Sequence, residues 1–328
     1  MKNRNQILKI LKLLLIWTVI IFVFGEVAAR IFVEFPLEFK DEKTTSFRFD
    51  EELGWFPKEG VTAVHHAKFS LEITNNNDGF RDVEHVKDPN RKSIAVLGDS
   101  FVWGYDVEAD KRITSRMNDF LPEWNIYNMG VSGYGTDQEY LLLKKWFPIY
   151  NPDVVYLVMH SNDSIDNRFN YNYMYYKPYF EMDNDELVVK GIPVPKCFRY
   201  QQVAHPILFK SKFVQAIALL YNRLFKPEQR KVPDLRLELL REMRDYVEGN
   251  GAEFRLVFTY EAKDQKEKNF LETEGIHYQY LPTRHKFKNY GRHWNAEGHE
   301  YVAFKILESL YRDGLITDED IEMNPDGI

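Results

Sequence analysis

The chain has very little cysteine. Its 328 residues include only Cys197, which excludes a disulfide within the chain. This count does not identify the compartment, because many exported bacterial proteins also lack cysteine pairs.

Basic residues are outnumbered by acidic ones, with 43 Lys and Arg against 50 Asp and Glu. The net charge of −7, with no basic stripe beyond the N-terminus, argues against a nucleic-acid partner.

An uninterrupted apolar run covers residues 13–24 and follows four basic residues, Lys2, Arg4, Lys9 and Lys12. The run is shorter than a span of about 20 residues, but snorkelling lysines extend it towards residue 7. A cleaved signal peptide and an uncleaved anchor are both consistent with it. Glu26 interrupts the nearest small-residue cleavage site, so we favour an anchor over residues 1–35. The basic residues ahead of the run predict that the rest of the chain lies outside the cytoplasm, on the envelope or periplasmic side.

The length of 328 residues, 44% of them hydrophobic, suits one large domain or a domain with insertions. Residues 36–92 predict an irregular, β-rich arm, and residues 314–328 a C-terminal tail. Between them, apolar runs that suit buried strands alternate with helical patterns, which predicts βαβ units and a parallel sheet covered on both faces. The predicted strands are 94–97, 126–128, 154–159, 254–258 and, more weakly, 277–281, and the predicted helices are 110–121, 137–150, 233–249 and 296–312.

The sequence indicates where two of these helices begin. Thr136-Asp137-Gln138-Glu139 reads as a capping box, in which the threonine accepts a backbone N–H and the glutamate reaches back. The last helix is predicted to start after Asn295 and to stop at Gly314.

An insertion at 164–232 interrupts the alternation and is interpreted as a lid or substrate wall. It contains a predicted hairpin, 179–182 with 187–190, and an amphipathic helix at roughly 207–225. A tyrosine-rich run precedes the hairpin and suits either a folded lid core or a sugar-stacking platform, of which we favour the platform. The tyrosines are Tyr171, Tyr173, Tyr175, Tyr176 and Tyr179.

Ser100 follows the first predicted strand directly, in the sequence Gly98-Asp99-Ser100. In open α/β sheets the carboxyl ends of the strands are where sites are built. A serine nucleophile needs a base and preorganised donors for the oxyanion. Candidates follow the next two strands, in the glycine-rich stretch 128–135 and in His160-Ser161-Asn162-Asp163, and His293 precedes the last helix.

These four separated blocks, in this order, resemble the SGNH/GDSL hydrolase family over roughly residues 93–313. The resemblance implies a three-layer α/β/α sandwich with a flavodoxin-like parallel sheet, beside the N-terminal transmembrane helix. It implies that Ser100 is the nucleophile and His293 the base. The oxyanion donors would be the N–H groups of Ser100 and Gly133, with Gly130 as the alternative to Gly133, and the side chain of Asn162. A segment of the arm, Asn76-Asn77-Asp78-Gly79-Phe80-Arg81-Asp82, resembles one found ahead of the serine block in membrane-anchored bacterial members.

One position departs from the family pattern. The family places an aspartate two or three residues before the histidine, to orient the imidazole, whereas this chain has Tyr290 and Gly291 there. A backbone carbonyl, Asn289 or a distant acid such as Asp163 could orient His293 instead. Asp99 is predicted to be structural, bonding the backbone N–H groups of its turn.

The predicted function is a serine esterase that removes acyl groups, acetyl above all, from an envelope or exported carbohydrate. An O-acyltransferase that uses the same serine and a non-catalytic glycan-binding or scaffold protein are the alternatives. No metal or organic cofactor is predicted. His65, His66 and His299 lack partners at metal-ligand spacing, so we interpret them as surface or packing residues.

Overall fold

The computed structural model describes residues 2–33, 45–66, 69–85, 90–225, 227–261, 265–288 and 292–321. The chain forms two compact units, residues 1–39 with 196–228 and residues 40–195 with 229–328. The insertion predicted at 164–232 is therefore divided. Its tyrosine run and hairpin belong to the second unit, and its amphipathic helix belongs to the first.

A five-stranded parallel sheet forms the centre of the second unit. Its strands are β5 (Ser93–Gly98), β6 (Asn125–Gly130), β7 (Val154–Met159), β12 (Glu253–Phe258) and β13 (His277–Tyr280). They are ordered β13-β12-β7-β5-β6, and every neighbouring pair is parallel. This is the flavodoxin-like order, with the first strand between the second and the third. The predicted fold class is confirmed.

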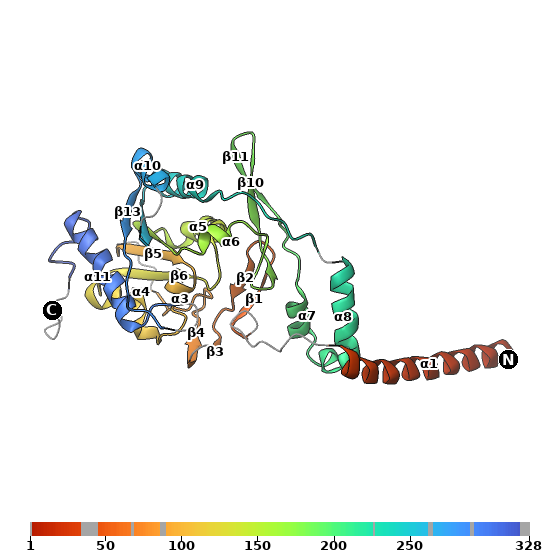
Figure 1. The fold of residues 1–328 in the computed structure, drawn as a ribbon. Coiled ribbons are helices and arrows are strands. Elements are labelled where there is room, and N and C mark those ends of the chain that lie inside the picture. Colours follow the sequence, from red (N-terminus) through yellow and green to blue (C-terminus); the bar gives the residue numbers. More distant parts are fainter. Residues whose placement is uncertain are drawn as a thin grey trace. The chain divides into compact units, whose positions relative to one another are not determined.

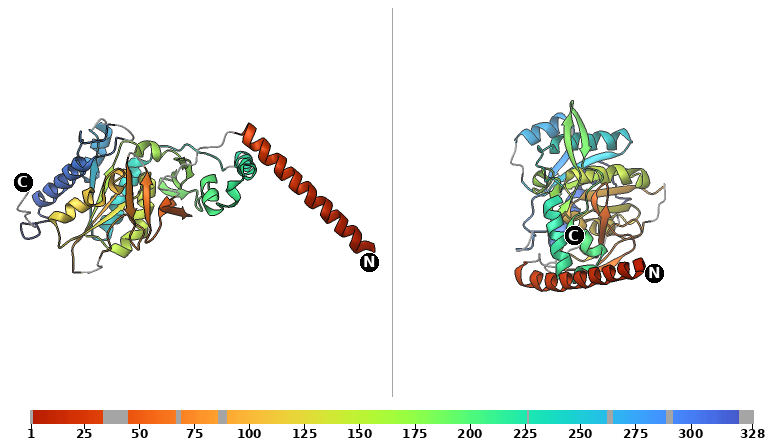
Figure 2. Two further views of the ribbon diagram at one scale, coloured as in Figure 1. Left: turned by 90° about the horizontal axis from the view of Figure 1, so that it is seen from below. Right: turned by 90° about the vertical axis from the view of Figure 1, so that its right-hand side faces the viewer.

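Helices cover both faces of this sheet (Figures 1 and 2). On one face, α4 (Ile113–Phe120) and α11 (Ala296–Arg312) share a buried cluster with Ile94, Val96 and Tyr156 of the strands. On the other face, α5 (Thr136–Tyr150) packs against β5, and α9 (Arg236–Gly249) packs against α5 and β12. The four predicted helices are confirmed to within a few residues, while α10 (Gln265–Thr273) was not predicted.

The capping box predicted at the start of α5 is wrong. Gly135 occupies the N-cap position, Thr136 is already the first helical residue, and no side chain caps the helix. Thr136 and Glu139 are completely buried, so burial, not capping, determines where these polar side chains point. The prediction for α11 is confirmed, because Asn295 accepts a hydrogen bond from the Gly298 N–H at 3.0 Å.

The arm contains two antiparallel hairpins, as the predicted β-rich character requires. The strands are β1 (Phe47–Asp50), β2 (Gly54–Pro57), β3 (Thr62–His66) and β4 (Ser70–Thr74). In the insertion, β8 (Tyr171–Asn172) pairs with β9 (Tyr175–Tyr176), and β10 (Tyr179–Asp183) pairs with β11 (Glu186–Lys190). The predicted hairpin is therefore present, turning at Asn184 and Asp185.

The structure does not support a sugar-stacking platform built from the tyrosine run. Tyr175, Tyr176 and Tyr179 are buried, and only Tyr173 is exposed to about half of its surface, at 47%. The Tyr175 ring packs against Trp55 at 5.8 Å between centroids. Three of the five tyrosines are therefore buried, because their large apolar rings are stabilised by leaving water.

The first unit contains α1 (Lys2–Phe32), α7 (Phe198–Ala204), a short 3₁₀ turn η2 (Leu208–Lys210) and α8 (Lys212–Phe225). Within Gln6–Phe32 of α1, the most apolar window of 18 residues has a mean hydropathy of 2.6, and none of its residues is buried. By length and composition this helix can cross a membrane, and it suits an anchor or a signal sequence equally well.

Candidate active site

Ser100 and His293 meet at the carboxyl edge of the sheet. Ser100 is the first residue of the short helix α3 (Ser100–Trp103), and the Asp99 carboxylate caps that helix by accepting from the Phe101 N–H at 2.9 Å. The structural role predicted for Asp99 is confirmed. Ser100 Oγ lies 2.8 Å from His293 Nε2, within hydrogen-bond distance. For Nε2 to accept a hydrogen bond from the serine hydroxyl, the neutral imidazole must carry its own hydrogen on Nδ1.

The acid beside His293 is Asp106, which the sequence did not suggest. Its Oδ2 lies 3.9 Å from His293 Nδ1, and its side chain is completely buried. Asp163, a candidate for this role, instead accepts from the His160 backbone N–H at 2.9 Å, and Asn289 lies outside the described residues. The family's acid precedes the histidine, whereas this acid follows the serine by six residues. An acid expected two or three residues before His293 therefore does not lead to Asp106, which is far from the histidine in the sequence.

Aromatic rings hold the imidazole of His293 from two sides. Tyr105 stacks on it, with 4.5 Å between centroids and 21° between planes, and Phe101 lies 5.2 Å away. The His293 side chain is 12% exposed. The packing restricts rotation of the ring, so Nε2 stays directed at Ser100.

The arm holds the loop that carries Tyr105 and Asp106. Arg81 is fully buried, and its guanidinium donates to the carbonyl oxygens of Trp103, Gly104 and Val107 at 3.1, 2.5 and 2.8 Å. Burial, followed by the nearby Arg112, lowers the pKa of Arg81 to about 9. The segment 76–82 was identified by resemblance alone. In the structure, Arg81 of this segment holds the loop that contains Asp106.

Gly133 lies in the loop that follows β6, with a φ of +79° that residues with a side chain rarely adopt. The arm braces this loop as well. Trp55 Nε1 donates to the Ser132 carbonyl oxygen at 3.1 Å, and Tyr134 donates its hydroxyl to the Trp55 carbonyl oxygen. Gly130 is a poor alternative donor, because its N–H already donates to Asn128 Oδ1 at 3.1 Å. The role of Gly133 as a donor stays a prediction.

Asn162 follows β7, but both hydrogens of its side-chain amide are engaged. Nδ2 donates to Asp99 Oδ2 at 3.2 Å and to Asp166 Oδ2 at 2.9 Å. The two carboxylates require donors, which determines which end of the amide is nitrogen. Asn162 can contribute to an oxyanion hole only if one of these bonds is released or shared. Its predicted role as an oxyanion donor stays a prediction.

Asp99 and Asp166 belong to a buried acidic cluster below the loops. Its members are Asp99, Asp137, Glu139, Asp163 and Asp166. Burial raises the pKa of Asp99 to about 6, and burial together with the neighbouring carboxylates raises the pKa values of Glu139 and Asp163 well above the usual range. Lys177, itself buried, donates to the Asp137 carboxylate and to the Asp166 carbonyl oxygen.

The raised pKa values and Lys177 both lower the negative charge that this cluster carries. Within the part of the chain that the structure describes, no three His, Cys, Asp or Glu side chains are grouped to hold a metal ion.

Two histidines near the site, the half-buried His160 and the buried His299, are held neutral. His160 stacks on Phe101 at 4.1 Å, and burial, followed by Lys286 and His293, lowers its pKa to about 3. His299 accepts from the Ile113 N–H at 3.2 Å through Nδ1, and burial, followed by Arg112 and Arg81, lowers its pKa to about 3. The packing role predicted for His299 is confirmed. His65 is also buried, with its ring against Trp103 at 5.2 Å between centroids.

We expect His299 to make the fold acid-labile. The unfolded ring titrates near 6.5 and the folded ring near 3, so the stabilisation is complete above pH 6.5 and is lost as the pH falls towards 3. The loss approaches about 1.4 kcal/mol per pH unit for one group. His299→Gln keeps a hydrogen-bond acceptor but cannot become charged. Between pH 6 and 4, the free energy of unfolding of this variant should therefore depend less steeply on pH, by about the slope given above.

Urea titrations of the full chain in mild detergent at several pH values measure this slope. His66→Gln is the matched control, because His66 is exposed. Equal slopes for His299→Gln and the unaltered chain would contradict the prediction.

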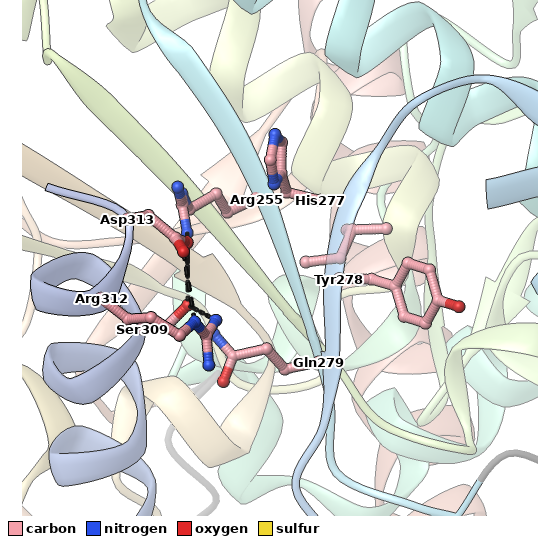
Figure 3. Close-up of a pocket in the computed structure, with 8 residues that line it drawn as sticks. Arg255, His277, Tyr278, Gln279, Ser309, Arg312 and Asp313 are labelled. Atoms are coloured by element: carbon pink, nitrogen blue, oxygen red, sulfur yellow. Dashed lines mark hydrogen bonds and ion pairs between the residues drawn. The ribbon is translucent and has the colours of Figure 1, made fainter. Parts of the chain in front are cut away.

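A separate small pocket lies away from Ser100, between β12, β13 and the end of α11 (Figure 3). Arg255 spans it, donating to Asp313 Oδ2 at 2.6 Å and to Ser309 Oγ at 3.3 Å. Arg255 and His277 occupy the first half of their strands, whereas Ser100 follows the end of its own. This pocket therefore does not belong to the Ser100 site.

No model of a protein family matches the sequence, and no curated protein matches it. Among solved structures, the chain is similar to a G-D-S-L family lipolytic protein from Desulfitobacterium hafniense DCB-2. That match has 11% identity and a TM-score of 0.37, and covers 65% of this chain and 98% of that chain. It is similar to the psychrotrophic esterase EstA from a Pseudoalteromonas species, with 10% identity and a TM-score of 0.39. That match covers 68% of this chain and 98% of the esterase. It is also similar to an acetyl xylan esterase, AlAXEase, with 12% identity and a TM-score of 0.38. That match covers 67% of this chain and 100% of the esterase.

Proposed function

We propose that this chain is a serine ester hydrolase in which Ser100 is the nucleophile and His293 the general base. The observation that carries the proposal is the 2.8 Å separation of Ser100 Oγ and His293 Nε2 at the carboxyl edge of the sheet. A serine hydroxyl attacks an ester only when a base removes its proton as the bond forms. The stacked, largely buried imidazole is suited to that task.

In the first half of the reaction, Oγ bonds to the ester carbonyl carbon as its proton moves to Nε2. The oxyanion of the tetrahedral intermediate would accept from backbone N–H groups, for which Ser100 and Gly133 are our candidates. The carbonyl re-forms, the alcohol leaves with the proton from Nε2, and an acyl-serine remains. Water then bonds to the acyl carbon as its proton moves to Nε2. The bond between this carbon and Oγ breaks, Oγ takes the proton from Nε2, and the acid is released with Ser100 regenerated.

Asp106 would act as the positioning residue of this pair. A carboxylate near Nδ1 favours the tautomer with hydrogen on Nδ1 and stabilises the imidazolium that forms during attack. At 3.9 Å the contact is an ion-pair distance and exceeds a direct hydrogen bond. An acid in this place also weakens the non-catalytic alternative, whose main support was the missing aspartate.

For the substrate we propose acetyl esters of a carbohydrate, held by a single-pass protein with its catalytic unit outside the cytoplasm. The candidate span in α1 supports a site near a membrane surface, and the order of basic and apolar residues supports the orientation. Transfer of the acyl group to a sugar hydroxyl requires the same first half-reaction, and only the acceptor differs.

Kinetics with an aryl acetate separate hydrolysis from transfer. We expect the full chain in detergent to release aryl alcohol and acetate in equal amounts, at a rate that added oligosaccharide leaves within about twofold. Release that requires the oligosaccharide, with acetyl appearing on the sugar, would show an acyltransferase instead. Release of neither product, with a folded chain by circular dichroism, would favour the non-catalytic alternative.

A further inference from the structure

An apolar stripe runs along the exposed side of α8. Its residues follow the i, i+3, i+4, i+7, i+8 spacing of one helix face, and each is 51% to 67% exposed. They are Ile217, Leu220, Tyr221, Leu224 and Phe225. Stripes with this spacing normally face a core, and a contiguous exposed one indicates a binding surface.

The beginning of α8 docks on the end of the apolar part of α1. Glu26 accepts from Ser211 Oγ at 2.8 Å and from the Phe213 N–H at 2.9 Å. The Phe213 ring packs edge-on against Phe22 at 5.8 Å and lies so close to Gly25 that a Cβ there would be 2.5 Å from it. Glu26 is the first charged residue after Lys12. The docking point is therefore where a spanning α1 would leave the hydrocarbon.

The direction of α8 relative to α1 is consistent with a helix that lies at the surface of the membrane. Figures 1 and 2 show α8 crossing the axis of α1 steeply, with α7 on the flank away from the N-terminal run of α1. A helix that crosses a spanning helix steeply lies close to the plane of the membrane. Three basic residues on or next to α8, Lys210, Lys212 and Arg223, can reach anionic headgroups.

We infer that α8 is an interfacial helix whose apolar stripe lies in the headgroup and acyl-chain boundary of a lipid bilayer. The inference rests on α1 spanning the membrane and is independent of ester hydrolysis. A helix of this kind buries its apolar face to a depth of about 5–10 Å. With α1 it would hold the chain by two membrane contacts, one across the bilayer and one along its surface.

The test uses the full chain in vesicles of phosphatidylcholine and phosphatidylglycerol, with Cys197→Ser removing the native thiol. An environment-sensitive fluorophore is attached through Leu220→Cys on the stripe, through Asn222→Cys about 160° away around α8, or through Val19→Cys in α1. We expect lipids with a shallow spin label to quench the Leu220→Cys probe at least about twofold more strongly than the Asn222→Cys probe. Lipids with a deep spin label should quench the Val19→Cys probe most.

Leu224→Cys provides a second stripe position if Leu220→Cys disturbs folding, which circular dichroism reports. Equal, weak quenching at both α8 positions overturns the inference, whether or not the probe in α1 is quenched. Energy transfer between differently labelled copies would then identify a second copy as the occupant of the stripe. If no such transfer is seen, another part of the same chain covers the stripe.

Discussion

Ser100→Ala should reduce aryl acetate hydrolysis by a factor on the order of 10⁴ or more. Alanine removes the only atom that can form the acyl-enzyme, and a methyl group fits where the hydroxyl was. The loss should appear in kcat, because the oxyanion donors and the binding surfaces remain. Steady-state and single-turnover kinetics of the full chain in detergent measure it.

Ser161→Ala is the matched control for this variant. Ser161 is exposed and lies in the loop after β7, beside the site but outside the proposed machinery. Its removal should leave the rate within about twofold. Activity of Ser100→Ala near that of Ser161→Ala would mean that the ester is cleaved elsewhere.

Asp106→Asn should reduce kcat by a factor on the order of 10² to 10⁴, with little change in KM. The amide has the volume of the carboxylate but no charge to stabilise the imidazolium. An asparagine in this place can also favour the unproductive tautomer, in which Nε2 carries the hydrogen. Because the imidazolium loses a stabilising negative charge, the acid limb of the pH–rate profile should move to lower pH.

The pH profile separates positioning of His293 from a merely structural role, which would lower activity without moving that limb. Asp110→Asn is the control, since Asp110 is exposed, lies four residues further along and contacts Lys111. An Asp106→Asn enzyme with unchanged kcat and an unchanged profile would remove Asp106 from the mechanism.

The parts of the site that could be predicted are those set by local pattern. Ser100 and His293 lie at a strand end and a helix start, and parallel strands bring such positions to one edge. Asp106 could not be predicted in this way. It reaches His293 because the loop after α3 folds back, and that path depends on Arg81, which lies 25 residues earlier in the chain and is buried against the loop's carbonyl oxygens.

The errors share a physical cause, which is burial by distant segments. Thr136 and Glu139 have the sequence of a capping box, yet tertiary packing places Glu139 among buried carboxylates. The tyrosine run has the composition of a sugar platform, yet three of its five rings are buried. The periodicity of 207–225 predicts an apolar face but not its partner, so the helix was assigned to a lid. It belongs instead to the unit that contains α1.

The most direct test of the account is the site of covalent labelling by a fluorophosphonate, located by peptide mass spectrometry on the full chain. We predict one adduct, on Ser100, which forms with the unaltered chain and with Ser161→Ala and slows by orders of magnitude in His293→Ala. No adduct on Ser100 in the folded chain, or labelling at an unchanged rate without His293, would contradict the claim that these two residues act together.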